Sequence, residues 1–192
     1  CRSFLQGWKD ENGVEVNSGR MNLGVVTVNL PRIALESEGD MNKFWEIFNE
    51  RMNIAEDALV YRVERTKEAT PANAPILYQY GAFGHRLGKE ENVDQLFKNR
   101  RATVSLGYIG LYEVATVFFG NSWEHNLEAK EFTLDIIRDM KRRVEEWSDQ
   151  YGYHFSIYST PSESLTDRFC RLDTEKFGSI PDITDKEYYT NS

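Results

Sequence analysis

The stretch Val25-Val26-Thr27-Val28-Asn29-Leu30, followed directly by Pro31, carries the clearest signal of the fold. A run rich in β-branched residues is typical of a strand buried on both faces, as in parallel sheets. Proline lacks the amide that a sheet ladder needs, so it ends such a strand. The stretch therefore predicts a buried strand that stops at Pro31.

Helical periodicity alternates with further strand patterns along the chain. Apolar residues recur at steps of three or four over residues 40–65, with Asp40 as a suitable N-cap, and again over residues 130–147. Shorter helices are predicted at residues 91–98, 112–119 and 162–176. Strands are predicted at residues 76–80, 102–106 and 153–157, and the polar stretch that runs up to Gly19 is expected to be irregular.

Four strands separated by helical segments indicate an α/β architecture with mostly parallel pairing. Four strands alone would make a small open sheet, and the sequence starts on Cys1 rather than on Met. We therefore expect about half of an α/β barrel, with residues 1–192 forming a single partial domain of a longer protein.

The composition excludes several classes of protein. Hydrophobic residues make up 40% and aromatic residues 13% of the 192 residues, which is enough for a packed core and excludes a disordered tail. The net charge of −8 argues against general DNA or RNA binding, and the chain has no apolar run long enough for a membrane span. Two cysteines are too few for a disulfide framework or a four-thiolate zinc site, so we expect a cytoplasmic protein.

Hydroxyl residues gather where the last predicted strand meets the last helix. Ser159, Thr160, Ser162 and Ser164 stand there with Pro161 and Glu163 among them. The amino end of a helix offers unpaired amides and a positive dipole end, which suit a phosphate group. The same residues suit capping alone, because Ser164 and Asp167 have the spacing of a capping box. Spacing by itself favours capping, since hydroxyl-rich helix starts are common.

Other candidate residues carry weaker signals. Gly107 and Gly110 follow a strand without forming a dinucleotide-binding fingerprint, so backbone packing is the simpler interpretation. The three histidines lack metal-ligand spacing, and no metal site is predicted. Cys170 is expected to be a buried structural thiol. Cys1 lies in a loop-like stretch, where it is either reactive or incidental.

Three blocks of sequence resemble the catalytic core of the anaerobic (class III) ribonucleoside-triphosphate reductases. The first runs from Cys1 to Leu5 and continues over residues 19–31, the second covers residues 101–113, and the third covers residues 158–169. Residues 183–186 and 188–192 fit the family as well, so the resemblance extends over nearly the whole chain in the right order.

This resemblance implies a ten-stranded α/β barrel of the kind found in glycyl radical enzymes. Cys1 matches the cysteine at the tip of the finger loop, which becomes a thiyl radical and abstracts the ribose 3′ hydrogen. Asn22 matches the asparagine that hydrogen-bonds the ribose hydroxyls, and Ser3 stands two residues past the radical cysteine. The segment Ser159–Ser164 matches the phosphate-binding loop, which reverses the preference for capping. Gly107 and Gly110 then border the substrate cavity.

The resemblance also implies groups that this sequence does not supply. These are a glycyl radical and a four-cysteine zinc site in a C-terminal segment, and ATP or dNTP effectors on an N-terminal regulatory module. We expect none of them to be bound within this chain, and we expect the isolated chain to show no turnover. The implied partners are a ribonucleoside triphosphate, formate or a thiol protein as reductant, a radical-SAM activating enzyme and a second copy of the full-length protein.

Two other functions stay open at this point. One is a different glycyl radical enzyme with a substrate that is not a nucleotide, and the other is a non-catalytic nucleotide-binding module. A Cys1→Ser exchange in the full-length protein separates a radical enzyme, which loses activity, from a binding module, which keeps it. A Ser162→Ala exchange that left nucleotide affinity intact would count against the phosphate-loop assignment.

Overall fold

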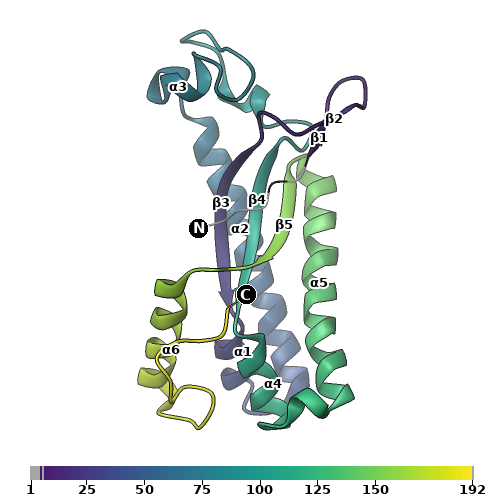
Figure 1. Cartoon of the computed structure of the whole chain (residues 1–192), viewed down its shortest axis with the longest axis vertical. Coiled ribbons are helices and arrows are strands. Elements are labelled where there is room, and N and C mark those ends of the chain that lie inside the picture. The colour runs from purple at the N-terminus through teal and green to yellow at the C-terminus, as the bar shows by residue number, and fades with distance from the viewer. Residues whose placement is uncertain (1–4, 6, 192) are drawn as a thin grey trace.

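A parallel sheet of three strands forms the centre of the protein in a computed structural model, which describes residue 5 and residues 7–191 (Figure 1). The strands are β3 (Met21–Asn29), β4 (Ala102–Ile109) and β5 (His154–Ser159), in the order β3-β4-β5. The strand predicted at Val25–Leu30 overlaps β3, which begins earlier, at Met21, and ends at Asn29, one residue before the predicted end. The expected α/β architecture with parallel strands is confirmed.

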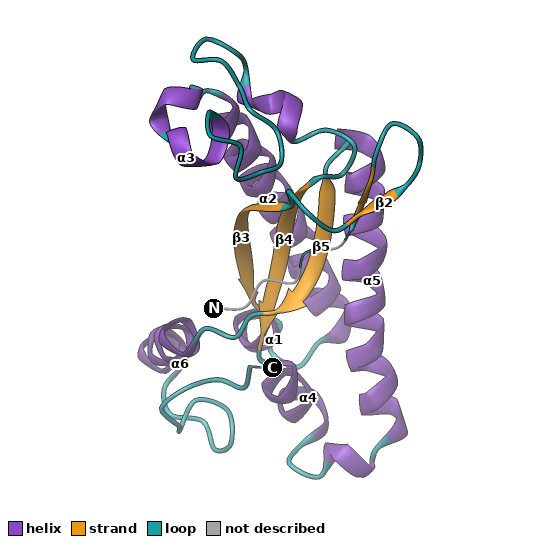
Figure 2. Cartoon of the chain, turned by 45° about the horizontal axis from the view of Figure 1, so that its top comes forward, coloured by secondary structure: helices purple, strands orange, loops and turns teal. Residues whose placement is uncertain are grey.

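Two long helices cover one face of this sheet (Figure 2). α2 (Met41–Lys67) packs against β3 and β4, and α5 (Leu127–Tyr151) packs against β5. Both helices were predicted, and the Asp40 side chain caps α2 by accepting bonds from the amides of the second and third helical residues. The apolar stripe of α2 is almost fully buried and consists of Phe44, Phe48, Met52, Ala55, Leu59 and Val63.

A short helix follows each strand at the carboxyl end of the sheet. These helices are α1 (Leu30–Glu36), α4 (Leu111–Phe119) and α6 (Glu163–Phe177). Pro31 ends β3 because it lies in the first turn of α1, where its missing amide and fixed φ are tolerated, and Asn29 is the N-cap. No helix was predicted at α1, since the proline was interpreted only as the end of a strand.

Smaller elements surround the amino end of the sheet. They are the hairpin of β1 (Trp8–Lys9) and β2 (Glu15–Val16), the helix α3 (Pro75–Tyr78), and the 3-10 turns η1 (Pro71–Asn73) and η2 (Val93–Leu96). A further 3-10 turn, η3 (Trp123–His125), lies between α4 and α5. A second apolar cluster holds much of the amino end together and includes Met21, Tyr78, Leu87, Phe97 and Ala102.

Several predictions about these smaller elements are wrong. The strand predicted at residues 76–80 is one helical turn, because Pro75 presets a helical φ and the amide of Tyr78 donates to the carbonyl of Ala74 at 3.1 Å. The fourth strand of the sheet therefore does not exist within the described residues. The helix predicted at residues 91–98 shrinks to η2, and the stretch expected to be irregular contains the β1–β2 hairpin.

No helix in the part of the chain that the structure describes combines the length and the apolar character needed to cross a bilayer.

Candidate functional site

The face of the sheet that points away from α2 and α5 is polar. Partners in parallel strands point to the same side, so this face is made of cross-strand rows. The rows are Asn22–Thr103–His154, Val25–Ser105–Ser156 and Thr27–Gly107–Tyr158. The residues between them, such as Val104 and Phe155, belong to the helix-side core. One side of the sheet thus serves folding, and the other carries hydroxyl, amide and imidazole groups.

A β-bulge brings Asn22 onto this polar face. Asn22 and Thr27 are five residues apart, and in a regular strand an odd separation places two side chains on opposite faces. The register of β3 against β4 shifts between Asn22 and Gly24, so that Leu23 is the extra residue and both side chains share one face. The positive φ of Gly24, +140°, suits glycine at this irregularity, and the Arg62 side chain fills the space where a Cβ would stand.

The side-chain amide of Asn22 is hydrogen-bonded through its oxygen but not through its nitrogen among the described residues. Its Oδ1 accepts a hydrogen bond from the Gly24 amide at 2.7 Å. Its Nδ2 is buried and has no hydrogen-bond partner among the described residues. A buried amide that lacks a partner is uncommon because desolvation without a bond is costly. The side chain therefore holds its Nδ2 in a fixed direction with its bonding capacity unused among the described residues.

Gly107 lies between two threonine hydroxyls near the other end of the same face. The Oγ1 atoms of Thr27 and Thr160 share a hydrogen bond of 2.9 Å, and a Cβ built on Gly107 would overlap both of them. The Thr160 amide donates to the Tyr108 carbonyl at 3.1 Å, which extends the pairing of β5 with β4 by one residue. Glycine at position 107 is therefore required for the link between strand β3 and the β5–α6 junction.

The hydroxyl cluster of the β5–α6 junction lies at the amino end of α6, as predicted. Ser162 is the N-cap, and its carbonyl accepts from the amides of Leu165 and Thr166, but its hydroxyl makes no capping bond. The capping box that the spacing of Ser164 and Asp167 alone favours does not form, because the helix already begins at Glu163 and Ser164 lies inside its first turn. The hydroxyl of Ser162 and the helix dipole are thus available to an anion.

Gly110 has a structural role of its own. It is the N-cap of α4 with φ +84°, in the left-handed region, and Pro31 of α1 occupies the space next to its Cα. Its amide donates to the carbonyl of Thr190 at 2.9 Å. Close packing of α1 and of the chain's last residues on β4 accounts for this glycine.

The structure therefore brings only some of the predicted site residues together. Asn22, Gly107 and Thr160 contribute to one face of the sheet and its carboxyl end, and Glu163 and Ser164 are exposed at the start of α6. Cys1 and Ser3 lie outside the described residues. Cys170 is a buried free thiol, as predicted, on the opposite side of α6 from solvent.

Sequence reasoning missed His154, which shares a row with Asn22. Its Nε2 is buried without a hydrogen-bond partner in the described residues, and burial together with the nearby Arg100 lowers the pKa of the imidazole. The sequence does indicate that His154 and Ser156 lie on the same face of the strand, because they are two residues apart in the alternating stretch 152–157.

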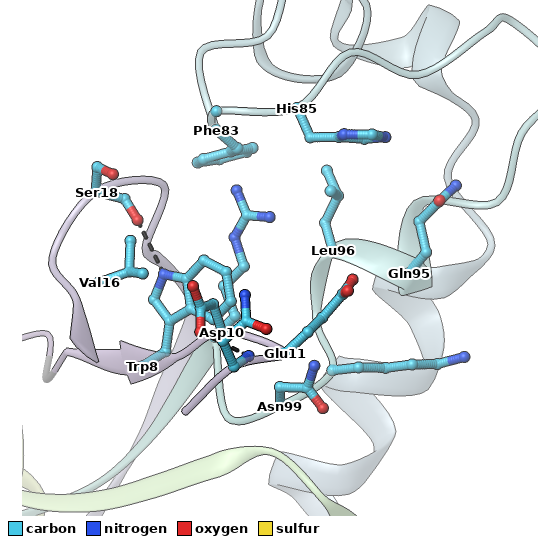
Figure 3. Close-up of a pocket in the computed structure, with 14 residues that line it drawn as sticks. Trp8, Asp10, Glu11, Val16, Ser18, Phe83, His85, Gln95, Leu96 and Asn99 are labelled. Carbon is cyan, nitrogen blue, oxygen red and sulfur yellow. Dashed lines mark hydrogen bonds between the residues drawn. The ribbon is translucent and has the colours of Figure 1, made fainter. Parts of the chain in front are cut away.

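A separate hollow of about 600 Å³ opens at the amino end of the sheet, away from α6 (Figure 3). Arg101 ties its walls together, since its Nε donates to the Gly19 carbonyl at 2.7 Å and its guanidinium lies 5.1 Å from the centre of the Trp8 ring. These contacts fix the β1–β2 hairpin, so we assign the hollow a structural origin. Within the described residues no three histidine, cysteine or acidic side chains are grouped to hold a metal ion.

Comparison with known proteins agrees with this arrangement. The family model described as anaerobic ribonucleoside-triphosphate reductase matches residues 1–192. Over the whole chain the sequence is 49% identical to the anaerobic ribonucleoside-triphosphate reductase of Salmonella typhimurium and 50% identical to that of Haemophilus influenzae. The chain spans 27% of the length of these relatives.

The fold agrees as well. The anaerobic ribonucleotide reductase from Thermotoga maritima, solved in complex with dATP and CTP, superimposes with a TM-score of 0.67 and 27% identity. The match covers 90% of this chain and 28% of that one, which confirms the expected part of a reductase barrel. A matching family model over every residue and a matching barrel segment lead to one conclusion: this chain belongs to the anaerobic ribonucleoside-triphosphate reductase family.

Proposed function

We propose that this chain forms the C-terminal, thiyl-bearing portion of a barrel that reduces ribonucleoside triphosphates to deoxyribonucleoside triphosphates without oxygen. The observation that carries the proposal is the polar sheet face, which runs from the unpaired Nδ2 of Asn22 to the Thr27–Gly107–Thr160 contact at the amino end of α6. The two ends are four strand steps apart on β4, or about 13 Å. A sugar joined to an extended triphosphate spans such a separation.

The amino end of α6 binds the phosphates in this proposal. Ser159, Thr160 and Ser162 supply hydroxyls, and the first-turn amides of Glu163 and Ser164 point toward the same end of the helix. The dipole of a 15-residue helix favours an anion there, even though the chain as a whole is acidic. The Glu163 carboxylate is exposed and can turn toward solvent.

The sugar lies over the polar face with its hydroxyls toward Asn22, whose Nδ2 donates to a ribose oxygen. The Cys1 thiyl takes the 3′ hydrogen atom, the 2′ hydroxyl gains a proton and leaves as water, and a reductant supplies two electrons and a proton. Cys1 then returns the hydrogen atom to C3′. Gly107 and Gly110 border this end of the cavity with their backbone in this proposal, while Thr27 and Thr160 pack beside Gly107 and Pro31 packs beside Gly110. The roles of Cys1 and Ser3 rest on the family resemblance alone.

The remaining groups of the reaction belong to other parts of the system. A glycyl radical in the longer protein would supply the oxidising equivalent by taking the hydrogen atom of the Cys1 thiol. This chain has two cysteines, so it cannot form a four-cysteine zinc site, and we derive no step through zinc. The proposal also includes formate or a thiol protein as reductant, a radical-SAM activating enzyme, nucleotide effectors, a homodimer and a cytoplasmic location.

The test exchanges the two cysteines separately in a reductase of the relatives' length that carries this sequence. Cys1→Ser should abolish formation of deoxyribonucleotide, because serine does not form the radical, while nucleotide binding stays unchanged. Cys170→Ser is the matched control, since it makes the same exchange at a buried thiol and keeps a donor for the Lys186 carbonyl, and it should keep turnover. Turnover by the Cys1→Ser variant would refute the proposal.

A further inference from the structure

The last described residues run alongside α6 and bond to it repeatedly (Figure 1). The Thr184 carbonyl accepts from the Thr174 hydroxyl at 3.0 Å, and the Lys186 carbonyl accepts from the Cys170 thiol at 3.1 Å. The Tyr189 amide then donates to the Thr166 carbonyl at 3.3 Å. Residues 184–189 thus follow α6 from its last turns back to its first.

A fully buried carboxylate on α6 anchors this segment. Oδ2 of Asp173 accepts from the Tyr189 hydroxyl at 2.7 Å and from the Asn29 side chain at 3.0 Å, and Oδ1 pairs with Arg32. The same carboxylate thereby joins α6 to the end of β3, to α1 and to the segment. Burial, and then the bond to Asp173, raise the pKa of Tyr189 far above its ordinary value, so its hydroxyl stays a donor.

A second fully buried carboxylate anchors the segment on α4. Oε1 of Glu113 accepts from the amide and the hydroxyl of Thr190 at 3.0 and 2.9 Å, and from the Lys186 ammonium at 2.5 Å. The Thr190 carbonyl accepts in turn from the Gly110 amide. Residues 184–190 therefore bridge α6 to the carboxyl end of β4.

We propose that residues 184–190 are a splint that holds the amino end of α6 in its phosphate-binding position, with Asp173 and Glu113 as positioning residues. The apolar contacts of α6 are few among the described residues: the cluster around it has Ile109, Cys170 and Tyr189 as fully buried members, with Leu165 and Phe169 packed against them. Buried polar anchors fix a helix direction more sharply than non-directional apolar contacts do. The inference rests on the proposed phosphate-binding function of α6.

Two neighbouring tyrosines provide a matched test in a reductase of the relatives' length. Tyr189→Phe removes the hydroxyl that bonds Asp173 and keeps the buried ring, whereas Tyr188→Phe removes a hydroxyl from a side chain that is 62% exposed. We expect Tyr189→Phe to speed amide hydrogen exchange of residues 163–167, to weaken binding of inorganic tripolyphosphate about tenfold, and to raise KM for the nucleotide with kcat nearly unchanged. Tyr188→Phe should change none of these.

The outcomes separate this inference from the proposed function. A merely structural role for the splint predicts a lower melting temperature but an unchanged tripolyphosphate affinity and KM, and that result would overturn the inference. Thr190→Val weakens the other anchor and should give the same pattern as Tyr189→Phe; an unchanged affinity in both variants would also overturn it. If the unsubstituted protein fails to bind tripolyphosphate at residues 159–164, the phosphate assignment itself is wrong.

Discussion

A single methyl group at Gly107 should disconnect the candidate phosphate loop from the sheet. The added Cβ of Gly107→Ala would stand 2.6 Å from Oγ1 of Thr27 and closer still to Oγ1 of Thr160, so the hydrogen bond between these hydroxyls cannot persist. Overpacking in a core costs about 1–3 kcal/mol, and a lost hydrogen bond adds about 1 kcal/mol. We expect a loss of roughly 2–4 kcal/mol, or about 4–16 °C in melting temperature for a chain of this size.

Gly107→Ala should also weaken ligand binding in the fraction of the protein that remains folded. The reason is that Thr160 must move, and the chain runs from Thr160 directly into the amino end of α6. Isothermal titration with tripolyphosphate at a temperature where the variant is folded measures this, and we expect the affinity to fall by about tenfold or more. Gly88→Ala is the control, since the nearest atom to its added Cβ is the end of the flexible Glu91 side chain at 3.3 Å. A Gly107→Ala protein that binds tripolyphosphate normally would refute the argument.

Three further outcomes follow from the same structure. Gly24→Ala should destroy the bulge and weaken nucleoside binding while phosphate binding persists, as separate titrations with a nucleoside and with tripolyphosphate would show. His154 is held neutral, with its pKa below the ordinary 6.5, so the unfolded state binds the proton first. The contribution of His154 to stability should therefore be fully present above its ordinary pKa of about 6.5 and be lost as the pH falls below it. Urea titrations should show that His154→Gln removes this part of the pH dependence. Burial raises the pKa of Cys170, so iodoacetamide at pH 8 should label it, by peptide mass spectrometry, only in urea.

The long helices were predictable because their stripes repeat many times. In α2 six apolar residues follow the helical period, and a capping Asp40 marks the start, so chance agreement is small. The short run Ile76–Tyr80 offers no such repetition, and its apolar residues suit a strand or a helical turn equally. Pro75 decided the outcome by presetting the φ of the first turn.

The anchors of α6 were beyond sequence reasoning for a different reason. Asp173 stands on α6, where the other acidic residues are exposed, and nothing local distinguishes it from them. Glu113 is the single acidic residue of the apolar helix α4, but its neighbours in sequence do not show what it pairs with. Their burial depends on Tyr189, Thr190 and Arg32, which are distant in sequence. Such pairings become visible only when the elements are placed in space.

The composition of the candidate site was visible in the sequence, but its geometry depends on one extra residue. The hydroxyl cluster of residues 159–164 can be found by eye, yet capping and phosphate binding use the same groups, and the sequence does not show that the Ser162 hydroxyl makes no capping bond. Asn22 and Thr27 pose the sharper case, because a regular strand would turn them to opposite faces. In a regular strand Asn22 would point to the helix-side core. Because Leu23 is an extra residue at the bulge, Asn22 instead lies on the face that carries Gly107. A shift of one residue in a strand therefore decides whether the groups proposed to bind the sugar and the phosphates can act on one molecule.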